Sequence, residues 1–457
     1  MCGKNLLALS FCLLAAFLLQ AQDYPFINRQ ANVLHYDSNS APMEFLFQKW
    51  GRIALTGKGN LSIVHIGGSH VQAGTLPHRI RTNILSAYPN AVGGRGLVFP
   101  YSAATKCNNP SDYKVHCAQK VVLTRNIQKN PLYPMGLCGI SVTAQDTLTR
   151  IQMLNNDKRF DYATQRIVVL GYSPSAVVPQ ISYDGLTLAP SYIDSVRHRF
   201  VFNLHTTVDS FDILLPCSRG QSFTLTGVYL SSRNHGITYS SIGVNGATVP
   251  DYLKCALTSD LRLLRPDLVI FGIGINDAHG PDFDSVAFKN NYLRLCDSVR
   301  SVNPHCAFIF FTNNDSYRRT GRRYSVNRNG LQVRDVCYRL AALTGGAVWD
   351  QFEVMGGLKS MAQWQAAKLA KRDKVHFTRA GYQLIGDLFC QALNVELQKD
   401  WQPVGVKQQK LTPPISTDSQ AITTDTTYHG KPLPRGLRRK SRHTSRPLNT
   451  PTTTTAQ

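Results

Sequence analysis

The stretch Leu61–Val71 constrains the fold most strongly, because an apolar run rich in β-branched residues ends at Gly67 and Gly68 and is followed by Ser69. This pattern predicts a buried strand that ends in a tight turn. In an open parallel sheet, ligands bind beyond the carboxyl ends of the strands, so Ser69 is a candidate nucleophile. The alternative is that Ser69 only caps the following helix.

Strands and helices alternate along two parts of the chain, which predicts an α/β fold whose parallel sheet has helices on both faces. The predicted strands after the serine strand are 237–244, 268–277, 307–312 and 346–349. The predicted helices are 75–87, 283–302, 330–344 and 380–394, with a short helical pattern at 43–49. The glycine-rich stretch 93–101 is expected to be a loop; it lacks the GxGxxG spacing of a phosphate-binding turn.

The middle of the chain, residues 103–235, has a different character. Short β-type runs follow one another with turn residues such as Asp184-Gly185 between them, and little there has a helical pattern. The runs are 119–125, 139–144, 166–170, 200–205, 211–215 and 223–230. We interpret this segment as an all-β sandwich-like domain inserted into the α/β domain, because a structureless excursion of that length would be unusual.

Both ends of the chain are predicted to lie outside the folded domains. Residues 1–21 resemble a signal peptide, with Lys4, an apolar stretch and a small residue at Ala21, which predicts export to the periplasm or the extracellular space. The apolar stretch is too short for a membrane span, and no later segment is long enough for one. Residues 401–457 form a basic Thr- and Pro-rich tail that we expect to be disordered.

The formal net charge of +22 suggests an anionic partner, and the tail carries +7 of it, from nine Lys and Arg against two Asp. An anionic polymer of the cell envelope could bind this tail, although a merely solvated tail is the simpler interpretation. We do not expect nucleic acid to be a partner of an exported protein.

Nine of the eleven cysteines lie beyond the predicted signal peptide. Export would permit disulfides, and Cys107 with Cys117 or Cys138 with Cys217 are candidate pairs. Because none of the cysteines shows CxxC spacing, we expect no zinc site, and nothing in the sequence calls for a cofactor.

Four polar clusters follow predicted strands, at residues 67–70, 244–246, 274–277 and 373–376. A serine hydrolase needs a base, a group that holds the base, and donors for the developing oxyanion. Asp373 and His376 could meet on a short turn, where the carboxylate would fix the imidazole tautomer. Each cluster alone could be a turn or a helix cap.

The oxyanion donors predicted from these clusters are the N–H groups of Ser69 and Gly246 and the side-chain amide of Asn276. Gly246 could also be present simply because its backbone needs a positive φ.

Together and in this order, the clusters resemble the four blocks of the SGNH (GDSL-like) hydrolase superfamily. The resemblance implies a three-layer αβα domain formed by residues 22–102 and 236–400. It also implies that Ser69 is the nucleophile, His376 the base and Asp373 its orienting carboxylate, with Gly246 and Asn276 as oxyanion donors. The flanking stretches 94–101, 241–247 and 375–382 resemble the exported bacterial branch with an inserted β domain.

Gly68 is the one departure, since the family's first block usually has aspartate there. The triad residues are all present, so the nucleophile's chemistry remains possible. Two functions are therefore weighed. The first is an exported serine esterase that removes O-acyl groups, chiefly O-acetyl, from a polysaccharide or from peptidoglycan. The alternative is a non-catalytic glycan-binding protein whose SGNH site has eroded. Ordinary α/β-hydrolases are disfavoured because the second glycine of their G-x-S-x-G turn is missing.

The predicted loop after strand 307–312 carries Arg318, Arg319, Arg322 and Arg323. These side chains could contact an anionic glycan near the active edge of the sheet, or they could simply be solvated.

Overall fold

The computed structural model describes residues 24–104, 107, 109–232 and 235–399. The predicted signal peptide and the predicted basic tail lie outside these residues.

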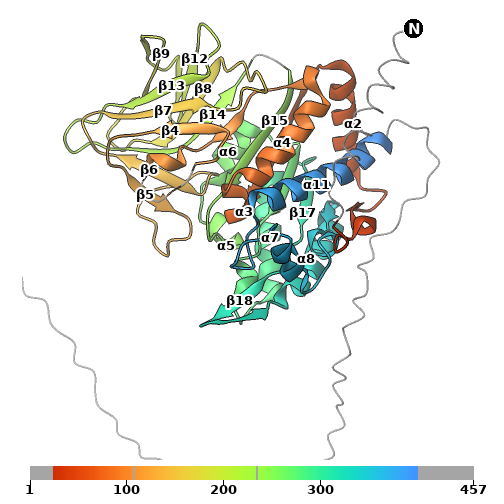
Figure 1. The fold of residues 1–457 in the computed structure, drawn as a ribbon. Coiled ribbons are helices and arrows are strands. Elements are labelled where there is room, and N and C mark those ends of the chain that lie inside the picture. Colours follow the sequence, from red (N-terminus) through yellow and green to blue (C-terminus); the bar gives the residue numbers. More distant parts are fainter. Residues whose placement is uncertain (1–23, 105–106, 108, 233–234, 400–457) are drawn as a thin grey trace, which may run out of the picture. The chain divides into compact units, whose positions relative to one another are not determined.

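A six-stranded sheet forms the centre of the α/β part (Figure 1). Five of its strands are parallel to one another, and the sixth, β1, pairs with one edge of them in the antiparallel direction. Across the sheet the order is β1 (Leu34–His35), β20 (Ala347–Trp349), β17 (Ala307–Phe311), β16 (Leu268–Gly272), β2 (Asn60–Gly67) and β15 (Gly236–Gly243).

The serine strand β2 is mostly apolar, and from Ile63 onward all of its residues are buried, because both of its faces are covered. Leu61 and Ile63 belong to one core cluster, which also contains residues of α2 (Ala41–Thr56), α4 (Thr75–Ala87) and α11 (Arg379–Lys399). Val64 and Ile66 belong to a second cluster, with residues of α7 (Ser285–Arg300) and α8 (Asn329–Thr344). Alternate side chains of a strand point to opposite faces, so helices cover both sides of the sheet, as predicted.

The middle segment folds into two antiparallel sheets, which confirms the predicted β architecture. The first has the order β10 (Leu186–Leu188), β9 (Gln180–Tyr183), β13 (Ser210–Leu215), β7 (Thr149–Asn155) and β4 (Tyr113–His116). The second has the order β11 (Tyr192–Asp194), β12 (Arg199–Asn203), β8 (Arg166–Tyr172), β14 (Phe223–Ser231), β6 (Ile140–Ala144) and β5 (Val122–Arg125). Buried and exposed residues alternate along β7 and β13, as in strands with one face on a core.

The sandwich shares its core with the α/β part, because the cluster that contains Val64 and Ile66 continues into the buried residues of both antiparallel sheets. The glycine-rich stretch predicted as a loop contributes to this junction. It contains β3 (Gly96–Val98), which pairs with β14, while the N–H of Leu97 donates to Oγ of Ser240. Gly96 has φ +84°, and a Cβ there would lie against Ser240, so only glycine fits.

The remaining elements are short. The helices are α3 (Ser69–Gln72), α5 (Val249–Tyr252), α6 (Leu257–Leu264), α9 (Gln351–Val354) and α10 (Ser360–Ala366), and β18 (Tyr317–Thr320) and β19 (Arg323–Val326) form a hairpin. Among the described residues there are also four 3-10 turns, at Arg29–Ala31, Pro89–Ala91, Tyr101–Ala103 and Asp277–His279. Helix α2 is much longer than the predicted 43–49; Ser40 caps its start and Gly57, in a left-handed conformation, ends it.

The suggested disulfides are wrong, since all nine cysteines of the described residues are free thiols. Cys138 and Cys217 are buried as small apolar side chains of the core, and the Cys117 thiol donates to the carbonyl oxygen of Gln119 instead. Within the described ranges, no helix is both long and apolar enough to cross a membrane.

Candidate active site

The site lies at the carboxyl edge of the parallel sheet, where three strands end side by side. Gly67 of β2 is in register with Gly243 of β15 and with Gly272 of β16. Gly67 must be glycine, because a Cβ there would lie 2.3 Å from Cγ2 of Val71. The loops that follow these strands therefore begin side by side at the same edge of the sheet. These loops carry three of the four predicted clusters.

Ser69 and His376 are brought together across 307 positions of the chain. Ser69 is the first residue of α3, and its Oγ lies 2.8 Å from Nε2 of His376. Nδ1 of His376 lies 2.9 Å from Oδ2 of Asp373. A hydrogen-bonded series of hydroxyl, imidazole and carboxylate results, in the order that nucleophilic catalysis by serine requires.

Asp373 is held by its own loop. Its Oδ1 accepts hydrogen bonds from the backbone N–H groups of Val375 and His376, both at 3.0 Å. Partial burial raises the pKa of this carboxyl, but these hydrogen bonds and the one from the imidazole outweigh burial, so its pKa is lowered. An ionised Asp373 favours the His376 tautomer with the proton on Nδ1, which leaves Nε2 free to accept the proton of Ser69.

The predicted oxyanion donors lie beside this series. Gly246 has φ +86°, and a Cβ there would meet nothing closer than 3.9 Å, so the backbone conformation rather than crowding calls for glycine. Nδ2 of Asn276 donates to the carbonyl oxygen of Ala247 at 2.9 Å, which joins the two donor loops and leaves its second hydrogen available. The N–H of Ser69 is in the first turn of α3, before that helix's own hydrogen bonds begin.

Gly68 lies directly against Asn276. A Cβ on Gly68 would be 3.2 Å from Nδ2 of Asn276, and 3.7 Å from the carbonyl oxygen of Ala247. A side chain at position 68 would therefore press on the amide that is predicted to bind the oxyanion. Glycine leaves that space open.

Two polar side chains hold the predicted donor loops in place: Gln72, which the sequence analysis did not single out, and Asp277, the last residue of the predicted cluster 274–277. Gln72, three residues after Ser69, accepts the N–H of Asn245 through Oε1 at 2.6 Å. Asp277 accepts the N–H of Val249 at 3.1 Å. Burial and the nearby Asp251 charge raise the pKa of Asp277 to about 7, although the hydrogen bonds that it accepts lower it. Asp277 directly follows the predicted site residue Asn276, and Gln72 lies one helical turn after Ser69; this spacing is the signal that could have found Gln72.

His70, which follows Ser69, is buried, and its hydrogen bond to Tyr382 turns it away from Ser69 as a candidate base in place of His376. Burial lowers its pKa to about 3, so its ring is neutral. Its Nδ1 lies 2.9 Å from the hydroxyl of Tyr382, and its ring centroid is 5.1 Å from that of His376. His70 therefore packs behind His376, beside a cavity of about 30 Å³ that is also lined by His65 and Asn314.

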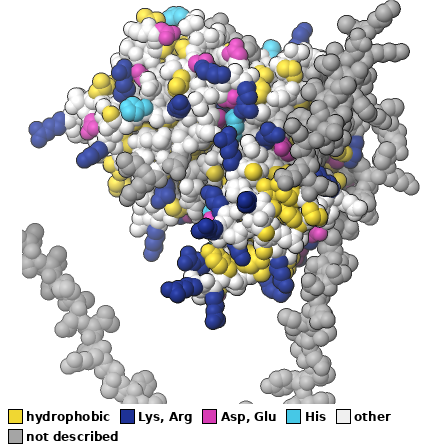
Figure 2. Space-filling model, viewed as in Figure 1, with side chains coloured by type: hydrophobic (Ala, Val, Ile, Leu, Met, Phe, Trp, Pro, Cys, Tyr) yellow, Lys and Arg dark blue, Asp and Glu magenta, His cyan; other side chains and the backbone are white. Residues whose placement is uncertain are grey.

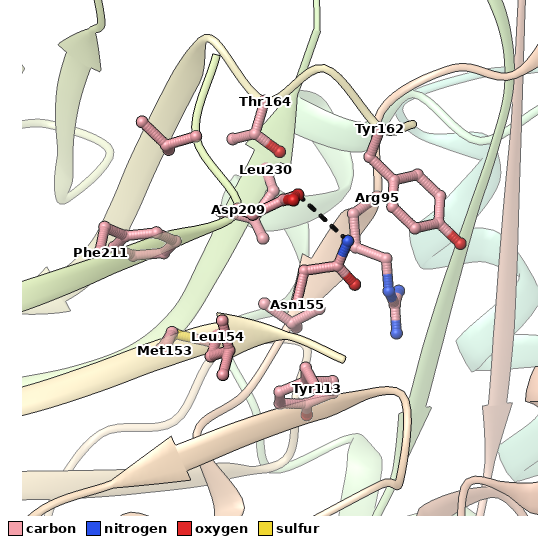
Figure 3. Close-up of a pocket in the computed structure, with 12 residues that line it drawn as sticks. Arg95, Tyr113, Met153, Leu154, Asn155, Tyr162, Thr164, Asp209, Phe211 and Leu230 are labelled. Carbon is pink, nitrogen blue, oxygen red and sulfur yellow. Dashed lines mark hydrogen bonds between the residues drawn. The ribbon is translucent and has the colours of Figure 1, made fainter. Parts of the chain in front are cut away.

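A second cavity of about 30 Å³ lies in the sandwich (Figure 3). Its lining includes Arg95, Tyr113, Tyr162 and Phe211, and Asn155 on its wall donates to Asp209 at 3.3 Å. This volume holds about one or two water molecules, so the cavity has no room for a sugar ring. Over the residues that the structure covers, no group of three or more His, Cys, Asp or Glu could hold a metal ion.

Comparison with known proteins agrees with this geometry. Residues 220–384 match the model of the GDSL-like Lipase/Acylhydrolase family. This part of the chain is similar to the GDSL-like hydrolases. The predicted SGNH resemblance and α/β fold are confirmed, and so is the predicted class of enzyme, a carboxylic ester hydrolase. No curated protein matches the chain.

Several solved structures are similar to this chain. A peptidoglycan O-acetylesterase is 19% identical with a TM-score of 0.66, over 80% of this chain and 99% of that one. An acetyl xylan esterase is 18% identical over 35% of this chain and 81% of that one, with a TM-score of 0.28. A GDSL-like lipase from Bacteroides thetaiotaomicron is 17% identical over 35% and 76%, with a TM-score of 0.27. Because its identity is only 19%, the similarity to the peptidoglycan O-acetylesterase, with a TM-score of 0.66, shows the fold alone.

Proposed function

We propose that the protein is an exported serine esterase that removes O-acyl groups, chiefly O-acetyl, from a polysaccharide or from peptidoglycan. The observation that carries the proposal is the hydrogen-bonded series Ser69–His376–Asp373, with separations of 2.8 and 2.9 Å. The neighbour with the TM-score of 0.66 is a peptidoglycan O-acetylesterase, which supports this choice of substrate.

In the proposed mechanism, Oγ of Ser69 attacks the carbonyl carbon of the ester while Nε2 of His376 takes the hydroxyl proton. The N–H groups of Ser69 and Gly246 and the amide of Asn276 donate to the oxyanion that forms. The C–O bond to the sugar then breaks, and His376 returns the proton to the leaving sugar oxygen. Water, deprotonated by His376, cleaves the acyl-enzyme and releases the carboxylic acid.

The eroded-site alternative predicts a different arrangement. A site that has lost catalysis has no need to keep the hydroxyl, imidazole and carboxylate within hydrogen-bonding distance of one another. Gly68 also removes no member of this series; it leaves space beside Asn276. We therefore favour catalysis, and the non-catalytic function is kept as an outcome of the experiment below.

The experiment compares Ser69→Ala with the wild type on p-nitrophenyl acetate and on O-acetylated peptidoglycan, with acetate release as the readout. Ser86→Ala, on the exposed side of α4, is the matched control. We expect Ser69→Ala to abolish hydrolysis and the control to have full activity. Absence of activity in the wild type, with glycan binding unchanged in Ser69→Ala, would support the non-catalytic alternative instead.

A further inference from the structure

The hairpin β18–β19 is the most strongly basic surface segment next to the candidate site. Residues 317–326 contain four arginines and no acidic residue. Gly321 has φ +60° at the first position of the two-residue turn, where tight hairpins need a left-handed residue. We call residues 317–326 the arginine hairpin. In Figure 2, Lys and Arg side chains gather at the end of the molecule where Figure 1 labels β18.

The arginine hairpin is attached to both sides of the candidate site. The N–H of Tyr317 donates to the carbonyl oxygen of Lys374, which lies between Asp373 and His376 in the chain. On the other side, Arg318 donates through Nη2 to the carbonyl oxygen of Ala278, two residues after Asn276. The hairpin therefore borders the loop of the predicted base as well as the loop of the predicted oxyanion donor.

Aromatic rings and cations alternate on the hairpin face that meets the catalytic loop. Nζ of Lys374 lies 4.6 Å from the ring centroid of Tyr317 and 5.5 Å from that of Tyr324. Arg319 lies over the same Tyr324 ring, at 6.0 Å. Tyr324 is 37% exposed and thus still offers apolar surface to a ligand.

The charges of the hairpin arginines are available to a ligand. Arg319, Arg322 and Arg323 are exposed. In the described part of the chain, none of the hairpin arginines forms an ion pair with Asp or Glu. A guanidinium binds a carboxylate through two parallel hydrogen bonds, so this surface is complementary to carboxylates.

We propose that the arginine hairpin is a subsite for carboxylates of the acylated glycan, so that the enzyme prefers esters on carboxylate-bearing glycans to esters on neutral ones. This inference rests on the proposed function, because it concerns the substrate of the same site. A neutral acetylated xylan offers no partner to the hairpin, whereas a glycan with carboxylates next to its ester groups does. Discrimination then arises from binding beside the reacting ester, not from the chemistry at Ser69.

The test uses soluble O-acetylated peptidoglycan fragments and the same fragments with their carboxylates converted to amides. The variant is Arg322→Gln/Arg323→Gln, and the control is Arg52→Gln/Lys58→Gln, which also removes two exposed positive charges. The control charges lie before the start of β2, at the edge of the sheet opposite Ser69. Neither double variant changes a residue of the proposed catalytic series.

For the wild type we expect kcat/KM to be about tenfold higher on the carboxylate fragments than on the amidated ones, as a few exposed charge pairs allow. The hairpin variant should lose most of this preference while hydrolysing p-nitrophenyl acetate at the wild-type rate, and the control should keep it. The preference should also shrink at about 1 M salt, where screening acts over about 3 Å. Equal rates on the two fragments by the wild type, or equal losses in both double variants, would overturn the proposal.

A binding measurement separates failure of this inference from failure of the proposed function. If the wild type hydrolyses no ester, the proposed function is wrong, and affinity for the two fragments is then measured by calorimetry on Ser69→Ala and on its combination with the hairpin variant. Weaker binding of the carboxylate fragments after loss of Arg322 and Arg323 would still support the subsite. If p-nitrophenyl acetate is hydrolysed but neither fragment is bound, the subsite is overturned. Binding of anionic lipid vesicles but not of fragments would likewise contradict it.

Discussion

Replacement of Asp373 by Asn should remove the base from Ser69 without unfolding the loop. Oδ1 of Asp373 accepts two backbone N–H groups, and the amide oxygen of Asn can keep both. Oδ2, which faces Nδ1 of His376 at 2.9 Å, is replaced by an NH₂ group. Nδ1 must then accept a hydrogen bond, so the proton moves to Nε2, and the imidazole can no longer take the proton of Ser69.

The size of the loss follows from the exposure of the carboxylate. The same change in an enclosed triad costs about 10⁴-fold in kcat. The side chain of Asp373 is 47% exposed and that of His376 32%, so water can replace part of the interaction. We therefore expect Asp373→Asn to lower kcat on p-nitrophenyl acetate by about 10²- to 10³-fold, equivalent to about 3 to 4 kcal/mol of transition-state stabilisation.

Steady-state kinetics with p-nitrophenyl acetate measure this loss, and thermal unfolding checks that the fold is intact. Asp184→Asn, in the exposed turn between β9 and β10, is the matched control and should have wild-type kinetics. The melting temperatures of both variants should stay close to that of the wild type. Activity of Asp373→Asn within twofold of the wild type would refute the proposed role of Asp373.

Three further predictions concern the neighbourhood of the site and the junction with the sandwich. Gly68→Ala should lower kcat about threefold to tenfold, because its Cβ would lie 3.2 Å from Nδ2 of Asn276 and displace the amide; unchanged kcat would show that Asn276 need not occupy this position. Asp277 has a folded-state pKa of about 7, above its ordinary value of 3.8, so folding stability falls as the pH rises from about 4 to about 7, and the full cost is present above about 7. Asp277→Asn removes this cost, so the melting temperature of the variant minus that of the wild type should be larger at about pH 8.5 than at about pH 5. If this difference were the same at both pH values, the raised pKa of Asp277 would be contradicted. Oδ2 of the buried Asp112 lies 2.6 Å from Nη2 of Arg81 and 2.5 Å from Nη2 of Arg95. Asp112→Ala leaves both guanidinium groups without this partner and should lower the free energy of unfolding in urea by about 3 to 5 kcal/mol. A loss below about 1 kcal/mol would mean that these ion pairs do not stabilise the junction.

The parts of the fold that were predicted correctly are mostly those with strong local sequence patterns. The helix Thr75–Ala87 has the predicted bounds, and β2 ends at the predicted turn, because apolar periodicity and glycine act within a few residues. Strands β4, β7, β9, β10 and β11 were not predicted; β4, β9, β10 and β11 are only three or four residues long, which is too short for a clear pattern. Helix α6 was missed as well, although its buried residues Leu257, Leu261 and Leu264 have helical spacing.

Contacts between distant residues were less predictable. The motif order suggested that Ser69 and His376 meet, but nothing local in the sequence pairs Arg81 with Asp112 or Gln72 with Asn245. The number of cysteines suggested disulfides, but most of these cysteines are free thiols buried in the core, where they pack as small apolar side chains. The roles assigned to Ser69, Gly246, Asn276, Asp373 and His376, and the division into domains, stay predictions.

The central claim is that Ser69 forms the acyl-enzyme, and a mass-spectrometric measurement tests it most directly. The protein is mixed with excess p-nitrophenyl acetate, quenched in acid within the first turnovers, and analysed intact and after proteolysis. The account predicts a gain of one acetyl group, located on the peptide that contains Ser69 and absent in Ser69→Ala. An active enzyme that carries no acetyl group under these conditions, or carries it on another residue with unchanged turnover in Ser69→Ala, would contradict the claim.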